Sequence, residues 1–344
     1  MIHLRCVDCG GKEVEICRTY TLKQGEHRTI YSCSACDRTF SETQNTPLAY
    51  LKTPIAVVVH VLSALTEGMG INAAARLYGV GKNSIYRWQK RLSGMKQTLL
   101  LYALTHQFLH QVIEGDELYT RVRKNVAPDE SQGWTIVLMD RATRFMWAMG
   151  CGRKDRKLLT PAIRQLCRVM KQTGDLTLLT DGERRYGNIL FEICHQVLRK
   201  GTRGRPKKTL RKGIKVRLKN KGAQAHKKGR KRPKYQAPFP EHPETIQNIA
   251  TQDIHANHLE AFNTSLRRRC AAYRRRTNMY AKNTIRLQER LDVYWIVHNF
   301  VRTHFTTHKV PAVALGILEH GFSLHEIFGS VRGNYGAIVS ARAA

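Results

Sequence analysis

The spacing of apolar residues changes along the chain, and each spacing predicts a different kind of element. Apolar residues at helical intervals predict a helix over residues 55–65 and two short helices within residues 70–92. Short apolar runs typical of strands begin near residue 108 and alternate with helical stretches further on. The expected strands lie within residues 108–123, 133–152 (a hairpin turning at residues 140–143) and 175–185, and the expected helices within residues 157–172 and 187–200.

These later elements follow one another as three strands, a helix, a strand and a helix. That order is typical of the ribonuclease-H-like fold, an α/β layer architecture, and we assign it to residues 108–310. In such folds, side chains from separate segments converge where strands end. The whole chain is predicted to be a multidomain α/β protein, and its weakly patterned C-terminal tail, residues 311–344, suggests no function.

In a late helical stretch, residues 253–282, Glu260 precedes many arginines, and residues 285–305 continue the helical pattern. An apolar stripe at helical spacing lies beside a polar row one position further on. The stripe consists of Leu259, Phe262 and Leu266, and the polar row of Glu260, Asn263 and Arg267. Taken alone, Glu260 fits either a salt bridge or a metal ligand at a phosphate-binding site.

The net charge of +32 and the isoelectric point near 10.2 are far from ordinary values. So large a positive field opposes compaction unless a polyanion neutralises it, and nucleic acid is the first candidate. An anionic membrane is the weaker one, because no apolar run approaches the roughly 20 residues of a spanning helix. The N-terminus also shows no signal peptide. We therefore expect a cytoplasmic, nucleoid-associated protein that binds double-stranded DNA and no membrane.

Residues 199–234 are the most basic part of the chain, with 18 lysines or arginines, five glycines and no acid. Such a composition does not bury enough apolar surface to offset the entropy of ordering. We predict a flexible insertion within the catalytic domain, at residues 199–240, that orders only on nucleic acid. A solvated linker explains the same composition equally well.

Four of the nine cysteines are arranged as two Cys-x-x-Cys pairs, Cys6 with Cys9 and Cys33 with Cys36. Two such pairs in a reducing compartment are typical of a tetrahedral zinc site with four thiolate ligands. Two short strand-like runs lie between the pairs, so residues 1–46 are predicted to form a zinc ribbon whose fold depends on the metal. A pair of disulfides is the alternative, and the odd number of cysteines disfavours it.

The two helices within residues 70–92 are joined at Gly79, Val80 and Gly81, a pattern typical of a helix-turn-helix. We assign residues 50–97 to such a DNA-binding domain, although an ordinary helical hairpin would show the same spacing. Polar residues on the open face of the second helix would contact bases and phosphates. They are Lys82, Asn83, Ser84, Arg87 and Lys90.

Three acids stand out by position: Asp116 on the first strand, Asp181 at the end of the apolar run 176–179, and Glu260 on the late helix. Three carboxylates without a neighbouring nucleophile suit phosphoryl transfer with two Mg²⁺ ions, because hard cations prefer oxygen ligands. Other acids lie nearby and remain open as alternatives. They are Glu114, Glu117, Asp140 and Glu183.

The sequence around these acids resembles the insertion-sequence-1-type transposases, a family with a catalytic Asp-Asp-Glu triad. The row Glu260, Asn263 and Arg267, followed by RRRT and Lys282, is similar to the third catalytic motif of that family. GDELY and TDGERRY, around the two aspartates, resemble the first two motifs. The likeness covers roughly residues 1–305 and includes the domain order, but the basic stretch separates the second and third acids more widely than in shorter relatives.

The resemblance implies a DNA transposase that binds the terminal inverted repeats of an insertion sequence and also target DNA. The three acids would hold Mg²⁺ for strand cleavage and strand transfer, with Asn263 and Arg267 as accessory residues. It also implies a homo-oligomer on DNA and a structural zinc. Two alternatives stay open: a DNA-binding regulator with an unused catalytic fold, and a structure-specific nuclease.

Overall fold

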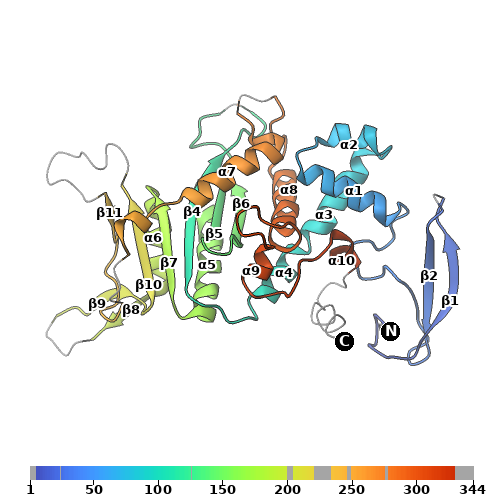
Figure 1. Ribbon diagram of the computed structural model, residues 1–344, viewed down its shortest axis with the longest axis horizontal. Coiled ribbons are helices and arrows are strands. Elements are labelled where there is room, and N and C mark those ends of the chain that lie inside the picture. Colours follow the sequence, from blue (N-terminus) through green and yellow to red (C-terminus); the bar gives the residue numbers. More distant parts are fainter. Residues whose placement is uncertain are drawn as a thin grey trace. The chain divides into compact units, whose positions relative to one another are not determined.

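The computed structural model describes residues 5–23, 25–124, 126–199, 204–220, 234–245, 249–275 and 278–329 (Figure 1). The chain divides into two units, and each is described by itself below. One unit comprises Met1–Tyr102 together with Phe322–Ala344, and the other comprises Ala103–Gly321. Among the described residues, none of the helices combines the length and the apolarity needed to cross a membrane.

The first unit begins with a small antiparallel sheet of three strands in the order β1-β2-β3. These strands are β1 (Val14–Thr21), β2 (His27–Cys33) and β3 (Thr39–Ser41). The sequence predicted the first two strands and missed the short third one. Cys6, Cys33 and Phe40 are its buried apolar residues, and β1 is exposed along most of its length. So little apolar burial does not stabilise a fold of this size, so the small sheet needs a further source of stability, such as a bound metal.

Helices make up the rest of the first unit. They are α1 (Ile55–Thr66), α2 (Ile71–Leu77), α3 (Lys82–Ser93), α4 (Lys96–Ala103) and α10 (Leu324–Gly329). Helix α1 packs against α2, α3 and α10. Gly79 turns the chain between α2 and α3 with φ +62°, a conformation that glycine adopts without strain. Ile85 and Trp88 of α3 are buried, so this helix presents its other side to solvent.

The second unit contains a mixed sheet in the order β11-β10-β7-β4-β5-β6. Its strands are β4 (Gln111–Tyr119), β5 (Trp134–Asp140), β6 (Met146–Gly152), β7 (Leu176–Asp181), β10 (Ile214–Lys219) and β11 (Tyr235–Gln236). Strands β4, β5 and β6 form an antiparallel meander, and β7 and β10 continue the sheet in parallel to β4. This mixed sheet is consistent with the ribonuclease-H-like fold expected from the sequence.

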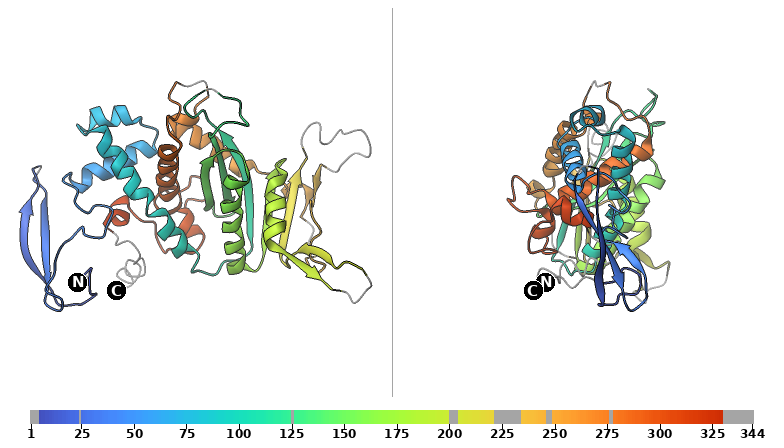
Figure 2. Two further views of the ribbon diagram at one scale, coloured as in Figure 1. Left: turned by 180° about the vertical axis from the view of Figure 1, so that it is seen from behind. Right: turned by 90° about the vertical axis from the view of Figure 1, so that its right-hand side faces the viewer.

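Helices cover both faces of this sheet. Helices α5 (Arg156–Thr173) and α6 (Arg184–Cys194) lie on one face, seen from behind in the left view of Figure 2. Helix α7 (Asn257–Arg269) lies on the other face, along β4 (Figure 1). Three short helical turns complete this unit: η2 (Thr251–Asp253), η3 (Ala271–Tyr273) and α9 (Pro311–Ala314).

Side chains of α8 (Thr284–Ile296) and of the π-helical turn η4 (Val297–Val301) cover the edge strand β6. The indole Nε1 of Trp295 donates to the Met146 carbonyl over 2.7 Å. The amide of Asn299 accepts from Met146 N over 2.9 Å, and Gln288 Oε1 accepts from Cys151 N over 2.7 Å. An edge strand otherwise presents unpaired backbone groups, and here an indole and two side-chain amides pair with three of them.

The prediction of a flexible insertion is wrong for part of residues 199–240. Strand β10 occupies an interior position of the six-stranded sheet, and β8 (His195–Leu198) pairs with β9 (Lys207–Leu210) in a separate hairpin. Ile214, Val216 and Leu218 alternate with cations along β10 and are buried. The high charge of the stretch concealed this period-two pattern, which is the mark of a strand. Residues 200–203 and 221–233 lie outside the described residues.

Candidate metal and nucleic-acid sites

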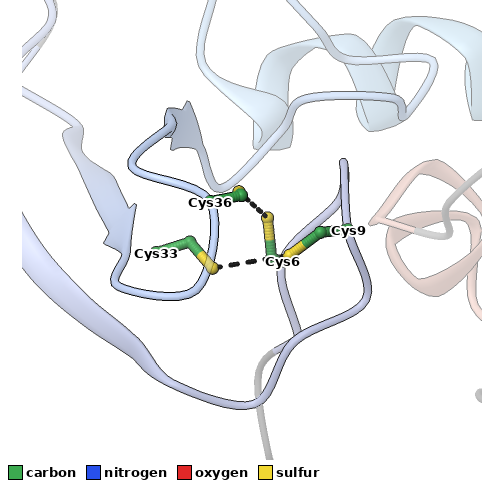
Figure 3. Close-up of side chains that lie close together, drawn as sticks. All are labelled: Cys6, Cys9, Cys33 and Cys36. Atoms are coloured by element: carbon green, nitrogen blue, oxygen red, sulfur yellow. Dashed lines mark hydrogen bonds between the residues drawn. The ribbon is translucent and has the colours of Figure 1, made fainter.

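The two Cys-x-x-Cys pairs meet at one end of the small sheet (Figure 3). Their sulfur atoms all lie within 4.8 Å of one another, with 3.7 Å between the Sγ atoms of Cys6 and Cys36 and 3.6 Å between those of Cys9 and Cys33. All four thiols are free. A tetrahedron with zinc–sulfur bonds of about 2.3 Å has edges of about 3.8 Å, whereas a disulfide requires about 2.05 Å. The cluster therefore fits a structural zinc.

The loops around these cysteines hold the sulfurs in place. Each loop is closed by a backbone hydrogen bond, from Cys6 N to the Gly11 carbonyl over 2.8 Å and from Cys33 N to the Arg38 carbonyl over 3.0 Å. Backbone N–H groups of Cys9 and Asp8 lower the pKa of the Cys6 thiol to about 7. The pKa of the Cys36 thiol is instead raised to about 12, and burial raises that of Cys33, so Cys6 is the one of these three thiols that reaches the zinc-binding thiolate form most easily.

The five residues predicted to contact DNA all lie on α3. Lys82, Asn83, Arg87 and Lys90 are exposed, and Ser84 is half-buried. Arg87 donates from Nε to the Asn83 carbonyl over 3.4 Å, so the side chain of Arg87 lies along the helix. The exposed residues lie away from the buried face of Ile85 and Trp88, so they form a polar and basic helix surface open to a partner.

The two predicted aspartates lie on neighbouring strands of the six-stranded sheet. The parallel register between β4 and β7 pairs Gly115 with Thr180, so Asp116 and Asp181 follow as the next residue on each strand. A Cβ at Gly115 would lie 3.3 Å from Thr180 Cγ2 and 3.7 Å from Tyr186 of α6. Because successive side chains alternate between faces, both aspartates lie on the opposite face, which α7 covers.

The predicted residues of α7 lie at different depths. Asn263 is buried and donates from Nδ2 to Asp116 Oδ2 over 2.8 Å. Its Oδ1 is buried without a hydrogen-bond partner among the described residues. Arg267 is half-buried, and Glu260 is exposed one turn before Asn263. The oxygens of Asp116, Asp181 and Glu260 do not all lie within 4.8 Å of one another, whereas the candidate ligand atoms of two other clusters among the described residues do.

One of those two clusters is the four cysteines at the small sheet, and the other centres on Glu114, which the sequence offered only as an alternative acid. The Glu114 carboxylate is fully buried and accepts hydrogen bonds from Arg141 Nε over 2.8 Å and from Leu259 N over 3.0 Å. His258 Nδ1 lies 2.8 Å from Glu114 Oε1, the oxygen that also accepts from Arg141, whereas Leu259 N donates to Oε2. Glu114 thus caps the first turn of α7 from another element, since the first N–H groups of a helix lack partners within it.

This cluster includes His255, and its three candidate ligand atoms lie within 4.8 Å. Arg141, however, fills the same site. Besides Glu114, its guanidinium donates to the carbonyls of Asp253 over 2.7 Å and of His255 over 2.5 Å. A fixed cation beside the carboxylate opposes a metal ion, so the cluster is a structural tie between β4 and the start of α7.

The other alternative acids are engaged in local structure. Asp140 accepts from the backbone and hydroxyl of Thr143 in the β5–β6 turn, and burial raises its pKa. Burial also raises the pKa of Glu117, which pairs with Lys154 over 2.9 Å. Burial opposes ionisation of Glu183, yet hydrogen bonds from Arg185 outweigh it and lower its pKa to about 2. These contacts engage all three acids in local structure, and Glu117 Oε1 is the one of their oxygens that is buried without a hydrogen-bond partner among the described residues.

No protein-family model matches the sequence, and no curated protein matches it. Among solved structures, the crystal structure of the Mos1 strand transfer complex is similar over 41% of this chain and 57% of that chain, with 14% sequence identity and a TM-score of 0.15. The chain therefore spans less than two thirds of that protein. A likeness this distant contributes nothing to the argument about function, which rests on the residues and their geometry.

Proposed function

We propose that the protein is a DNA transposase of the insertion-sequence-1 type, with Asp116, Asp181 and Glu260 as its catalytic carboxylates. The observation that supports this most is the adjacent position of the two aspartates in neighbouring parallel strands, beneath the helix that contains Glu260. Strand ends of α/β sheets are where ligands collect. Three carboxylates from three distant segments are the kind of ligand that a hard divalent cation prefers, and Glu260 would have to approach the two aspartates to complete the set.

The residues at this site suit Mg²⁺. Asp116 and Asp181 offer carboxylate oxygens, and the buried Asn263 Oδ1 offers a further oxygen that has no partner among the described residues. Glu260 is exposed and would close over the ions from α7. When bound, Mg²⁺ would activate the attacking oxygen and stabilise the leaving one.

The chain's own residues would arrange the reacting groups. Asn263 holds the Asp116 carboxylate in one orientation through the 2.8 Å hydrogen bond, and Glu114 fixes the start of α7. Arg267, one turn after Asn263, would neutralise a phosphate oxygen. Helix α3, with Arg87 and Lys90 exposed, would bind the terminal repeats, and the cysteine cluster with zinc would stabilise the ribbon beside it.

The proposal is tested on DNA from either side of the gene. A labelled fragment containing each flank would be incubated with the purified protein and Mg²⁺, and nicking and joining to a second DNA would be followed separately. Cleavage at a 3′ end followed by joining is the expected result. Tight binding without cleavage would identify a regulator, and cleavage without joining would identify a nuclease.

A further inference from the structure

Strand β10 places a lysine directly beside the proposed catalytic aspartates. Lys219 is the partner of Asp181 in the parallel register of β10 and β7, and Asp116 follows on the next strand. On the outer side, Tyr235 of β11 pairs with Lys219. One row across four strands therefore reads Tyr235, Lys219, Asp181 and Asp116, with about 4.8 Å between neighbouring strands.

The members of this row share the face of the sheet that α7 covers. A Cβ at Gly187 of α6 would lie 3.7 Å from Cγ1 of Val216, so Val216 faces α6. Lys219 is three residues further along β10 and therefore faces the opposite side, as Asp181 does. Tyr235 is directly opposite Lys219 in an antiparallel pair, and such pairs lie on one face.

Lys219 and Tyr235 are both accessible. Each is half-buried, and the ammonium of the exposed Lys234 lies 5.5 Å from the centre of the Tyr235 ring. Arg217 lies two residues before Lys219 on β10 and therefore on the same face, but it is buried and paired with Glu241. The cation at the end of β10 is thus the one placed to meet a ligand, next to an aromatic ring and a second cation.

We propose that this row is the track of the DNA strand that leaves the catalytic carboxylates. Lys219 contacts a phosphate next to the reacting one, and Tyr235 stacks on the adjoining base, with Lys234 near the phosphate beyond. The inference rests on the proposed function, since it names how the substrate of that same site is held. Phosphate contacts by lysine and stacking on an exposed ring are the usual means of holding a single strand.

The first test replaces Lys219 by alanine or glutamine and compares each variant with Lys171→Ala. Lys171 is an exposed lysine near the end of α5, five residues before β7 begins, whereas Asp181 and Lys219 lie where β7 and β10 end, so its replacement changes the net charge equally at a distance from the row. Binding of an end fragment is measured in Ca²⁺ over a range of salt. Losing one phosphate contact should reduce the slope of log affinity against log salt by about 0.7 to 0.9, and Lys219→Arg should restore it.

The second test locates the contact on the DNA. A neutral methylphosphonate linkage is placed at each position beside the cleaved bond, and an abasic nucleotide is placed likewise. A methylphosphonate at one position should weaken binding of the DNA to the unchanged protein, and the same methylphosphonate should not weaken binding to Lys219→Gln. An abasic nucleotide at one position should weaken binding to the unchanged protein about tenfold or more. The same abasic DNA should not weaken binding to Tyr235→Ala, and it should still weaken binding to Tyr235→Phe.

The outcomes separate the two proposals. If the unchanged protein never cleaves the end fragment in Mg²⁺, the proposed function fails. If it cleaves, yet Lys219→Gln and Tyr235→Ala behave like Lys171→Ala in both scans, the strand track is wrong and the row is structural only. Circular dichroism checks that each variant is folded. Where Lys219→Gln or Tyr235→Ala fails to fold, the scans on the unchanged protein, Lys219→Arg and Tyr235→Phe decide whether the strand track exists.

Discussion

Asn263 donates a hydrogen bond to Asp116 over 2.8 Å, and this bond joins α7 to the central strand of the six-stranded sheet. A second tie runs from Leu259 N to Glu114. The two ties are two residues apart on the strand, about 6.6 Å, and four residues apart on the helix, about 6 Å. Strand and helix therefore run side by side in matched steps, and α7 cannot slide by a turn without breaking both bonds.

The first prediction concerns Glu114. Its replacement by alanine should lower the free energy of unfolding by about 3–5 kcal/mol, because the Arg141 cation would lose its carboxylate partner in a mostly buried position. Glu114→Gln keeps one acceptor and should cost less. Thermal and urea unfolding of the second unit would measure both changes.

The same variants test the placement of α7. Folded Glu114→Gln protein should lose most of its DNA cleavage while keeping its affinity for DNA. Glu319→Gln, which alters an exposed acid of the same unit, is the matched control and should change neither property. Equal cleavage by Glu114→Gln and the unchanged protein would show that the tie does not position the site.

The sequence could single out Asp181 because it follows an apolar run and ends β7, and the end of a strand is a local feature. Asp116 lies within β4, so only its likeness to a family motif pointed to it, and the catalytic role of both aspartates stays a prediction. Glu114 could not be distinguished from its neighbours in this way. Its importance depends on Arg141 and His258, which are 27 and 144 residues away and meet it only in the folded sheet. Contacts of such separation leave no local pattern.

Strand β10 was missed for a different physical reason. Lys215, Arg217 and Lys219 make the segment read as a polycation, although Ile214, Val216 and Leu218 between them bury one face. The cost of burying Arg217 is offset by Glu241, a residue from beyond the undescribed stretch 221–233. Net charge over a long window therefore hides a short strand, and alternation over six residues is the better guide.

The second prediction concerns the cysteine cluster. The purified protein should contain one zinc ion, and Cys33→Ser should lose it and unfold the small sheet, because its few buried residues do not suffice alone. The second unit should keep its unfolding temperature. Metal analysis and NMR of the first unit provide the measurement.

Cys17→Ser serves as the control for the zinc. Cys17 is exposed on β1 and lies outside the cluster of four sulfurs. Its replacement should leave both the zinc content and the sheet intact. A metal-free protein with a folded ribbon would overturn the assignment.

The third prediction concerns how α3 recognises DNA. Arg87→Ala should reduce the preference for terminal-repeat DNA over random DNA, because a base contact contributes to specificity while a phosphate contact does not. Arg76→Ala, an exposed arginine on α2, should weaken both complexes about equally. Competition binding at fixed salt distinguishes a loss of specificity from a uniform loss of affinity. An unchanged preference in Arg87→Ala would exclude this residue from base recognition.

The fourth prediction is a pH dependence of stability. His298 is fully buried, and this burial lowers its pKa to about 3, while its Nε2 donates to the Arg144 carbonyl over 2.9 Å. In the unfolded chain the pKa is about 6.5. The neutral ring therefore stabilises the fold above pH 6.5, and this contribution decreases as the pH falls from 6.5 toward 3, by up to about 1.4 kcal/mol per pH unit.

His298→Gln tests this dependence, because the glutamine amide can still donate to the carbonyl and does not titrate. Between pH 6.5 and 5, where most carboxylates stay ionised, the unchanged protein should lose stability faster than the variant. Urea unfolding at several pH values gives the two slopes. Identical slopes would mean that the histidine is not buried as a neutral ring.

The last prediction separates an enzyme from a DNA-binding regulator. Asp116→Asn, Asp181→Asn and Glu260→Gln should each abolish Mg²⁺-dependent cleavage of the end fragment, by several orders of magnitude, because carboxylates that hold ions together act as a unit. DNA affinity in Ca²⁺ should stay equal or rise slightly, since each change removes a negative charge near phosphates. Glu319→Gln should remain fully active. Of the three, Glu260 is the most exposed, so it provides the sharpest test: full activity in Glu260→Gln would show that another acid completes the site.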